Sequence, residues 1–379
     1  MGLSALLVAV SISNMILLRS SNGREDSLDI GRSSTSVTFD PNRPSFISNL
    51  HPEEVPSWLL TYITWHRHQR SLLTPTNWMH RNFLILRCIH GADPVCGGLA
   101  DRITPLPALL HLAADTDRIL FIHWDRPGPL STWLPPRSID WTLPAYVPLR
   151  PGPYTKVYTK WETLVSALQQ NTKTTAASPN NHRGAPTVAC VRIQTVPGTM
   201  KTSDFNNTAL LRPVFGLMFG APRVDAPASA VAATTPYLAA HIRARYGRRP
   251  IPPHKYPAVA AWAVACVQSK RKNTATPVVV VSDTTAVMEA ARGVTGVLHE
   301  RSDNRSTSTI PLHLDKDPVV STAVDPAAYA SVFWDLFRLA QAECVSYGPG
   351  GYGRLGAALA QCGVAYYQDG RYQDCGTPT

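Results

Sequence analysis

The residues best suited to binding an anion lie at positions 241–249, which read H-I-R-A-R-Y-G-R-R. From His241 to Lys255 there are four arginines, one lysine and two histidines, and no acidic residue. A run of small apolar residues predicts a strand here, at whose end Arg243 and Arg245 project to the same side. Guanidinium groups hold phosphate through paired hydrogen bonds. The pattern therefore predicts a phosphate site, with a solvated basic loop as the alternative.

Two further polar segments follow apolar runs of strand length. Residues 278–281, V-V-V-V, lead directly into Ser282 and Asp283. The serine could cap the next helix, and the carboxylate could accept hydrogen bonds from a base or a ribose. Residues 344–347 lead into a glycine-rich turn that opens another helix, where backbone N–H groups favour an anion. The candidate residues of this turn are Gly350, Gly351, Tyr352, Gly353 and Arg354.

The first half of the chain contains a comparable turn. The sequence C-G-G-L-A-D-R at residues 96–102 follows an apolar run and precedes a helix-length segment. Gly97 and Gly98 would shape this loop at the end of the expected strand, near the ligand site. Asp101 and Arg102 could contact either substrate of a transfer reaction, or simply pair with each other.

Strands and helices must alternate along the chain to position these turns. Such alternation is typical of parallel, doubly wound sheets, which bind ligands at the carboxyl ends of their strands. We therefore expect an α/β fold with two Rossmann-like domains that face a cleft. The expected strands are residues 82–89, 118–123, 187–193, 237–243, 277–281, 344–347 and 364–367.

The length of 379 residues and the 44% hydrophobic content indicate about two globular domains and exclude general disorder. We expect residues 58–225 to form an N-terminal Rossmann-like domain with a low-complexity insert at 171–186, and residues 226–379 to form a C-terminal Rossmann-like domain. Residues 20–57 are rich in serine and have no sustained period, which predicts a flexible stem.

Features of the N-terminus and of the cysteines point to the secretory pathway. Residues 1–19 contain an apolar stretch that is short for a membrane span and long for the core of a signal peptide, which favours a signal-anchor or a cleaved signal peptide. No Lys or Arg precedes it, so its charges give no orientation. We expect a single-pass protein of the Golgi or ER membrane with a lumenal domain, in which Asn206 and Asn304 are N-glycosylation candidates. The candidate disulfides are Cys88–Cys96 and Cys362–Cys375, and at least one of the seven cysteines stays free.

Four blocks occur in an order that resembles a known family. G-G-L-A-D-R, H-I-R, V-V-V-V-S-D and the glycine turn ending in Arg354 resemble the GT-B type, GDP-fucose-dependent fucosyltransferases, the superfamily of α1,2-, α1,6- and protein O-fucosyltransferases. The resemblance covers about residues 82–367. It implies that Arg243 holds the donor β-phosphate, that His241 lies near the guanine, and that Asp283 contacts the nucleoside. Residues 350–354 would surround the pyrophosphate and the fucose.

The chain departs from the family pattern at three places. Arg245 follows an alanine where the α1,6 enzymes have H-x-R-R. Proline and glycines stand at 349–351 where the family carries Ser or Thr. Ala100 and Asp101 replace the Gly-Asn of many relatives. The departures affect the acceptor class more than donor binding.

The resemblance implies an inverting transfer of fucose from GDP-fucose to a glycan or protein hydroxyl, with residues 58–225 on the acceptor side and residues 226–379 as the nucleotide-sugar-binding domain. We expect no metal or other cofactor, because no cluster of acidic residues joins the D-x-D pairs. We expect no nucleic-acid partner, because the N-terminus is of secretory type and the basic residues lack an aromatic signature for RNA. Arg243 and its neighbours would stabilise the leaving GDP. Asp101 is the candidate base for the acceptor hydroxyl and Asp125 the alternate. Two alternatives stay open: a non-catalytic sugar-nucleotide or glycan binder, and a metal-dependent GT-A enzyme. The GT-A alternative would use the D-x-D pairs Asp115 and Asp117 or Asp315 and Asp317.

Overall fold

The structure is a computed structural model in which the chain divides into Met1–Val37 and Thr38–Thr379. All residues described below belong to the second unit. They are residues 45–47, 50–89, 92–93, 96–175, 188–192, 208–222, 236–245, 250–270, 276–298, 326–368, 371–372 and 375. The expected signal segment, the boundary near residue 225 and both glycosylation candidates, Asn206 and Asn304, lie outside the described residues.

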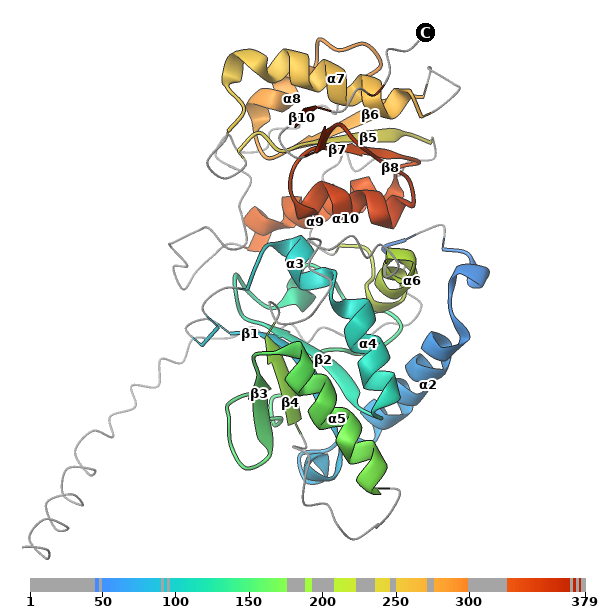
Figure 1. Ribbon diagram of the computed structural model, residues 1–379, viewed down its shortest axis with the longest axis vertical. Coiled ribbons are helices and arrows are strands. Elements are labelled where there is room, and N and C mark those ends of the chain that lie inside the picture. Colours follow the sequence, from blue (N-terminus) through green and yellow to red (C-terminus); the bar gives the residue numbers. More distant parts are fainter. Residues whose placement is uncertain are drawn as a thin grey trace, which may run out of the picture. The chain divides into compact units, whose positions relative to one another are not determined.

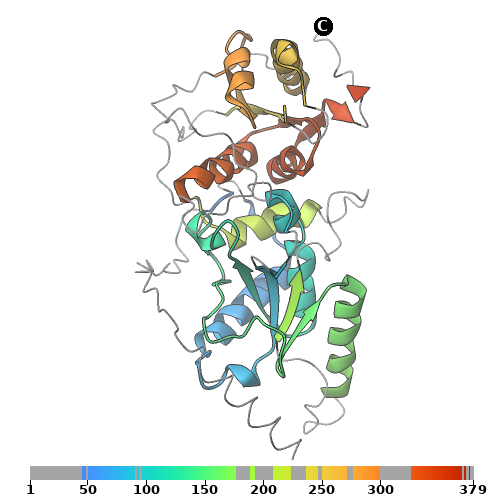
Figure 2. The same cartoon turned by 90° about the vertical axis from the view of Figure 1, so that its left-hand side faces the viewer.

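The first sheet has four parallel strands in the order β2-β1-β4-β3. Figures 1 and 2 show α5 beside β3 at one edge and α2 beside β2 at the other. Its strands are β1 (Phe83–Cys88), β2 (Ile119–Trp124), β3 (Thr155–Tyr158) and β4 (Val188–Arg192). The helices of this half are α2 (Ser57–Ser71), α3 (Leu99–Ile103), α4 (Leu106–Asp115), α5 (Trp161–Thr175) and α6 (Thr208–Met218).

The second sheet also has four parallel strands, in the order β6-β5-β7-β8. Figure 1 shows α7 and α8 on one of its faces and α9 and α10 on the other. Its strands are β5 (Leu238–Ile242), β6 (Val278–Ser282), β7 (Val345–Tyr347) and β8 (Gly363–Ala365). The helices are α7 (Tyr256–Gln268), α8 (Thr285–Ala291), α9 (Pro326–Gln341) and α10 (Gly351–Ala360), and a short antiparallel pair follows as β9 (Tyr367–Gln368) and β10 (Arg371–Tyr372).

The two parallel sheets with interleaved helices confirm the expected α/β class with doubly wound, Rossmann-like halves. The central strands β1 and β5 and the neighbouring β6 are nearly continuous apolar runs, as expected for parallel strands that are covered on both faces. All five side chains of β5 and all six of β1 are buried.

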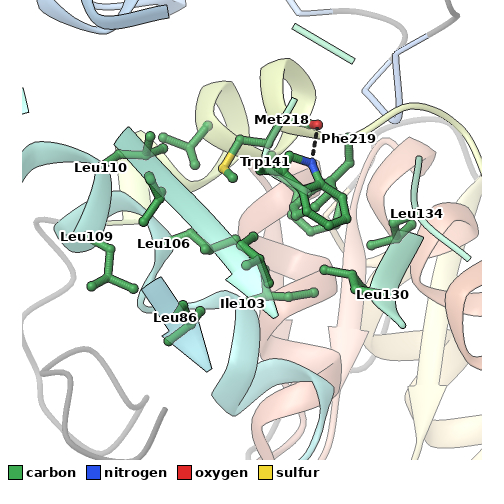
Figure 3. Packing of buried hydrophobic residues seen from close by; sticks show 14 of the residues in the cluster. Leu86, Ile103, Leu106, Leu109, Leu110, Leu130, Leu134, Trp141, Met218 and Phe219 are labelled. Atoms are coloured by element: carbon green, nitrogen blue, oxygen red, sulfur yellow. Dashed lines mark hydrogen bonds between the residues drawn. The ribbon is translucent and has the colours of Figure 1, made fainter. Parts of the chain in front are cut away.

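The core of the first half extends beyond the segment that we expected to be ordered. Phe46 and Ile47, inside the expected stem, are fully buried because they pack with aromatic side chains such as Phe215. Figure 3 shows the same cluster around the buried Trp141, whose Nε1 donates a 3.0 Å hydrogen bond to the carbonyl of Met218. Residues 46 and 47 therefore belong to the packed core and not to a flexible stem. At the other expected boundary, α5 continues to Thr175 and includes the beginning of the insert at 171–186.

Three disulfide bonds are present among the described residues. Cys88–Cys96 forms as expected. The expected bond Cys362–Cys375 is wrong, since Cys362 pairs with Cys344 and Cys375 pairs with Cys266. Cys344 and Cys362 stand directly before β7 and β8, whose first residues are in register, so their Cα atoms lie 4.6 Å apart. Cys190 on β4 is a buried free thiol.

Among the described residues, no helix has both the length and the apolar character required to cross a membrane.

Candidate functional site

His241 lies near the carboxyl end of β5, where its side chain is buried against the first turn of α10. The imidazole is only 4% exposed, and Nδ1 has no hydrogen-bond partner among the described residues. Gly353, in the first turn of α10, packs so closely that a Cβ there would collide with this Nδ1. Burial, reinforced by the charge of Arg243, lowers the pKa of His241 to about 3. His241 is therefore neutral at pH 7.

Arg243 lies against the residue that precedes α10. Gly350 has a φ of 99°, a conformation suited to glycine, and a Cβ at this position would collide with Nη1 of Arg243. Gly350 is the N-cap of α10, and no side chain caps the helix there. A guanidinium and the N-terminal end of a ten-residue helix thus adjoin one another. Both favour an anion, through charge and through backbone N–H groups.

Asp283 connects the ends of β5 and β6. Its two carboxylate oxygens accept hydrogen bonds from the backbone N–H groups of Ala244 (2.7 Å) and Arg245 (3.0 Å). The aspartate therefore fixes the loop that carries Arg243 and Arg245. The contact of this carboxylate with the nucleoside stays a prediction. In the structure both of its oxygens bind backbone N–H groups of the loop.

The neighbouring Ser282 is buried, and its Oγ accepts a hydrogen bond from the N–H of Thr284 at 3.3 Å. Thr284 is the N-cap of α8, although its side chain makes no capping hydrogen bond. Ser282 therefore stabilises the turn before α8.

The remaining residues of the glycine turn have distinct surroundings. Gly351 is the first residue of α10. Tyr352 is half-buried, its ring lies 5.3 Å from that of His241, and its hydroxyl donates a hydrogen bond to the carbonyl of Val332 on α9. Arg354 is half-buried in the same first turns of the helix. Tyr352 thus helps to hold α10 in place beside His241.

The sequence did not indicate the role of Tyr366. Its hydroxyl donates a 3.0 Å hydrogen bond to the backbone carbonyl of His241 and packs on Gly348. This contact connects the strand end of β5 to the segment after β8. A single tyrosine after a short strand carries no pattern that would distinguish it from a core residue.

In the first half, Arg102 organises the loop that contains Gly97 and Gly98. The arginine is fully buried, its Nε donates to the carbonyl of Gly97 (2.8 Å), and Nη1 donates to the carbonyl of Arg126 (2.5 Å). Its guanidinium also lies 5.0 Å from the ring of Trp124. Arg102 therefore joins the turn before α3 to the end of β2.

Asp101 and Asp125 occupy different positions on this side. Oδ2 of Asp101 accepts a hydrogen bond from the N–H of Gly98 at 2.9 Å, and Gly97 beside it has a φ of 74°. Asp125 is exposed and follows β2, and its N–H donates to the carbonyl of Cys88. Both carboxylates thus lie at the carboxyl edge of the first sheet, as the sequence predicts.

Sequence reasoning also missed an ion cluster at that edge. Asp93, nearly fully buried, contacts Nη2 of Arg87 at 3.0 Å and Nε of Arg192 at 2.9 Å. A usable signal existed, because Arg87 interrupts an otherwise apolar strand, and a buried charge requires a partner.

The described residues contain no group of three His, Cys, Asp or Glu side chains that could hold a metal ion. Asp115, at the end of α4, contacts His111 at 2.9 Å. The second D-x-D pair, Asp315 and Asp317, lies outside the described residues.

A cavity of about 430 Å³ lies elsewhere, lined by residues of the segment 45–55 together with Arg137 and Leu217. None of the strand-end residues above contributes to its lining. The candidate site is therefore defined by the strand ends and their side chains.

Comparison with known proteins gives structural matches only. No family model matches the chain, and no curated protein matches it. It is similar to the fucosyltransferase NodZ from Bradyrhizobium, with 14% identity, a TM-score of 0.42, and coverage of 73% of this chain and 92% of NodZ. It is also similar to a mutant of Arabidopsis thaliana FUT1 in complex with GDP, with 12% identity, a TM-score of 0.48, and coverage of 85% and 80%.

The similarity to these structures concerns the fold. A further NodZ structure, described as an α-1,6-fucosyltransferase soaked with GDP-fucose, is 15% identical with a TM-score of 0.41 and covers 74% of this chain and 92% of its own.

Proposed function

We propose that the protein is a glycosyltransferase that transfers fucose from GDP-fucose to a hydroxyl of a glycan or a protein, with inversion and without a metal ion. The observation that carries this proposal is the contact of Arg243 with Gly350 at the uncapped start of α10. A diphosphate bound there would receive charge-assisted hydrogen bonds from the guanidinium and from backbone N–H groups. The choice of guanosine and fucose rests on the resemblance of the four sequence blocks to GDP-fucose-dependent enzymes.

In this reaction the acceptor oxygen forms a bond to the anomeric carbon of fucose while the bond from that carbon to the β-phosphate oxygen breaks. The bonding electrons leave with GDP, whose negative charge increases. Arg243 and the start of α10 would stabilise this charge in place of a metal ion, and Asp283 holds the backbone of Ala244 and Arg245, next to Arg243. Asp101 and Asp125 are the candidate carboxylates of the acceptor side that would accept the proton of the hydroxyl.

The proposal is tested by calorimetric titration of the full chain with GDP and GDP-fucose. Replacing Arg243 with alanine removes a charge-assisted contact worth about 1.5–3 kcal/mol, so GDP affinity should fall at least about tenfold. Arg292→Ala is the matched control, because this exposed arginine pairs with Glu289 on α8. Equal GDP affinity of Arg243→Ala and wild type would refute the site assignment.

Turnover separates the enzyme from the alternatives. Release of GDP from GDP-fucose should continue in EDTA. A complete loss that manganese restores would instead support the metal-dependent reaction and direct attention to Asp315 and Asp317. Tight binding of GDP-fucose with no release of GDP in the presence of glycan acceptors would identify a non-catalytic binder.

A further inference from the structure

Three polar side chains form a row across the first sheet. Arg87 on β1 is in register with His123 on β2 and with Arg192 on β4. Residues paired in register on parallel strands lie on the same face of the sheet. The preceding residues on this face are apolar and buried: Phe83, Ile85, Ile119, Phe121, Val188 and Cys190. The row therefore begins where the apolar face ends, at the carboxyl edge where parallel sheets bind ligands.

The two arginines of this row are committed to structural contacts. Both contact Oδ1 of the buried Asp93, whose Oδ2 accepts the N–H of Ile89 at 2.9 Å. Arg87 also donates to the carbonyl of Leu149 at 2.8 Å. A guanidinium stays protonated in proteins and cannot accept a proton. Of the three side chains in the row, His123 is therefore the one that can accept a proton.

The surroundings of His123 keep it in the form of a base. Burial lowers its pKa below the usual 6.5, Arg87 acts in the same direction, and Asp125 opposes both. These two are the charged groups that act on the ring from the described elements around it. The imidazole is thus neutral at pH 7, and it is half-buried rather than enclosed.

The same strand end is joined to the glycine turn of the first half. Arg102 donates both to the carbonyl of Gly97 and to that of Arg126, three residues after His123. Asp101, the carboxylate first expected to act as base, uses Oδ2 to hold the N–H of Gly98. No hydrogen bond of the His123 side chain is present among the described residues. Asp125 follows two residues later and acts on the imidazole through its charge, so that a histidine and a carboxylate stand at one strand end.

We propose that His123 is the catalytic base of the acceptor side and that Asp125 is its positioning residue. The inference rests on the proposed function. The imidazole accepts the proton of the acceptor hydroxyl as the oxygen bonds to the anomeric carbon, and the bonding electrons of the broken C–O bond leave on GDP. The carboxylate of Asp125 stabilises the imidazolium that results.

The test uses GDP-fucose with water and azide as acceptors, so the natural acceptor does not have to be known. Water must lose a proton when it attacks, whereas azide carries none. In His123→Ala and His123→Gln we expect hydrolysis to fall by about 100-fold, with azide transfer close to that of wild type. GDP affinity should stay within about twofold, and His111→Ala, which changes an exposed histidine on α4, should behave as wild type.

The pH profile provides a second measurement. Wild-type hydrolysis should increase with pH and reach its plateau before pH 6.5, because the pKa of His123 lies below that value. The rate of His123→Gln should not change over the same pH range. Unchanged hydrolysis in His123→Ala would overturn the assignment, and so would an equal loss of the water and azide reactions, since a structural defect affects both. Loss of hydrolysis in Asp101→Asn but not in His123→Ala would return the role to Asp101. Wild type that binds GDP but reacts with neither acceptor would refute the base, whereas wild type that fails to bind GDP would refute the proposed function itself.

Discussion

At the scale of single residues, the absence of a side chain at position 350 lets Arg243 reach the start of α10. In Gly350→Ala the new Cβ would occupy the place of the guanidinium, which can move aside because it ends a flexible chain. We expect the variant to fold with a loss of about 1–3 kcal/mol, since alanine is strained at a φ of 99° and a ψ of 165°. Its GDP affinity should fall at least about tenfold in calorimetry.

The matched control is Gly152→Ala. Gly152 has no positive φ, and a Cβ there would meet only the carbonyl of Arg150 at an ordinary distance of 3.9 Å. This variant should bind GDP as wild type does. Normal GDP binding by Gly350→Ala would show that the contact between residues 243 and 350 has no part in the site.

A second residue-scale prediction concerns His66 on α2. Burial lowers its pKa to about 4, although the hydrogen bond to the carbonyl of Leu120 acts in the opposite direction. Below pH 6.5 the unfolded chain takes up a proton that the folded chain does not, so stability is full above pH 6.5 and falls as the pH approaches 4. The slope is at most about 1.4 kcal/mol per pH unit for this group.

His66→Gln removes the titrating group and keeps a donor for the carbonyl of Leu120. Its melting temperature should therefore fall less between pH 7 and pH 5 than that of wild type. His68→Gln, which changes an exposed residue of the same helix, is the control and should retain the wild-type slope. Identical slopes for all three proteins would contradict the assignment.

At the scale of elements, the buried parallel strands were predictable because they read as short apolar runs. β6 and β1 are the clearest cases. β3 was missed, since its four residues form no continuous apolar run and follow a proline-rich region. α6 was missed as well, because Pro213 inside the helix disrupts the expected pattern.

The candidate site could be predicted in part for the same reason. Arg243 and residues 350–354 follow strands directly, so their convergence results from topology alone. The roles of Asp283 and Tyr366 depend on which backbone groups face them across neighbouring strands. Such contacts are set by strand register, which no local sequence pattern encodes.

The disulfides provide a prediction at this scale. Peptide mapping without reduction should recover Cys266 joined to Cys375 and Cys344 joined to Cys362. Cys190 should react with an alkylating reagent only after unfolding, because it is buried and burial raises the pKa of its thiol to about 12. Recovery of a Cys362–Cys375 peptide, or rapid labelling of Cys190 in the native protein, would contradict this arrangement.

At the scale of the whole molecule, we propose that residues 1–19 anchor the chain and that the rest lies in the secretory lumen. Three disulfides are typical of an oxidising compartment. The full-length protein should resist carbonate extraction and carry glycan at Asn206 or Asn304, detected as a mobility shift lost in the double Gln variant. Deletion of residues 1–19 is the control and should abolish both properties. An unglycosylated, soluble cytosolic protein would refute the proposal.

The carboxylate of Asp283 has a consequence for the thermodynamics of ligand capture. Since the backbone of Ala244 and Arg245 is already held by Asp283 in the free protein, a nucleotide that binds at this strand end would lose little affinity to ordering these residues. The amide hydrogens of Ala244 and Arg245 should then exchange slowly with solvent deuterium even without ligand, and GDP should slow them little further. In Asp283→Ala, by contrast, these two amides should exchange rapidly until GDP is added, and the entropy of binding should become more unfavourable.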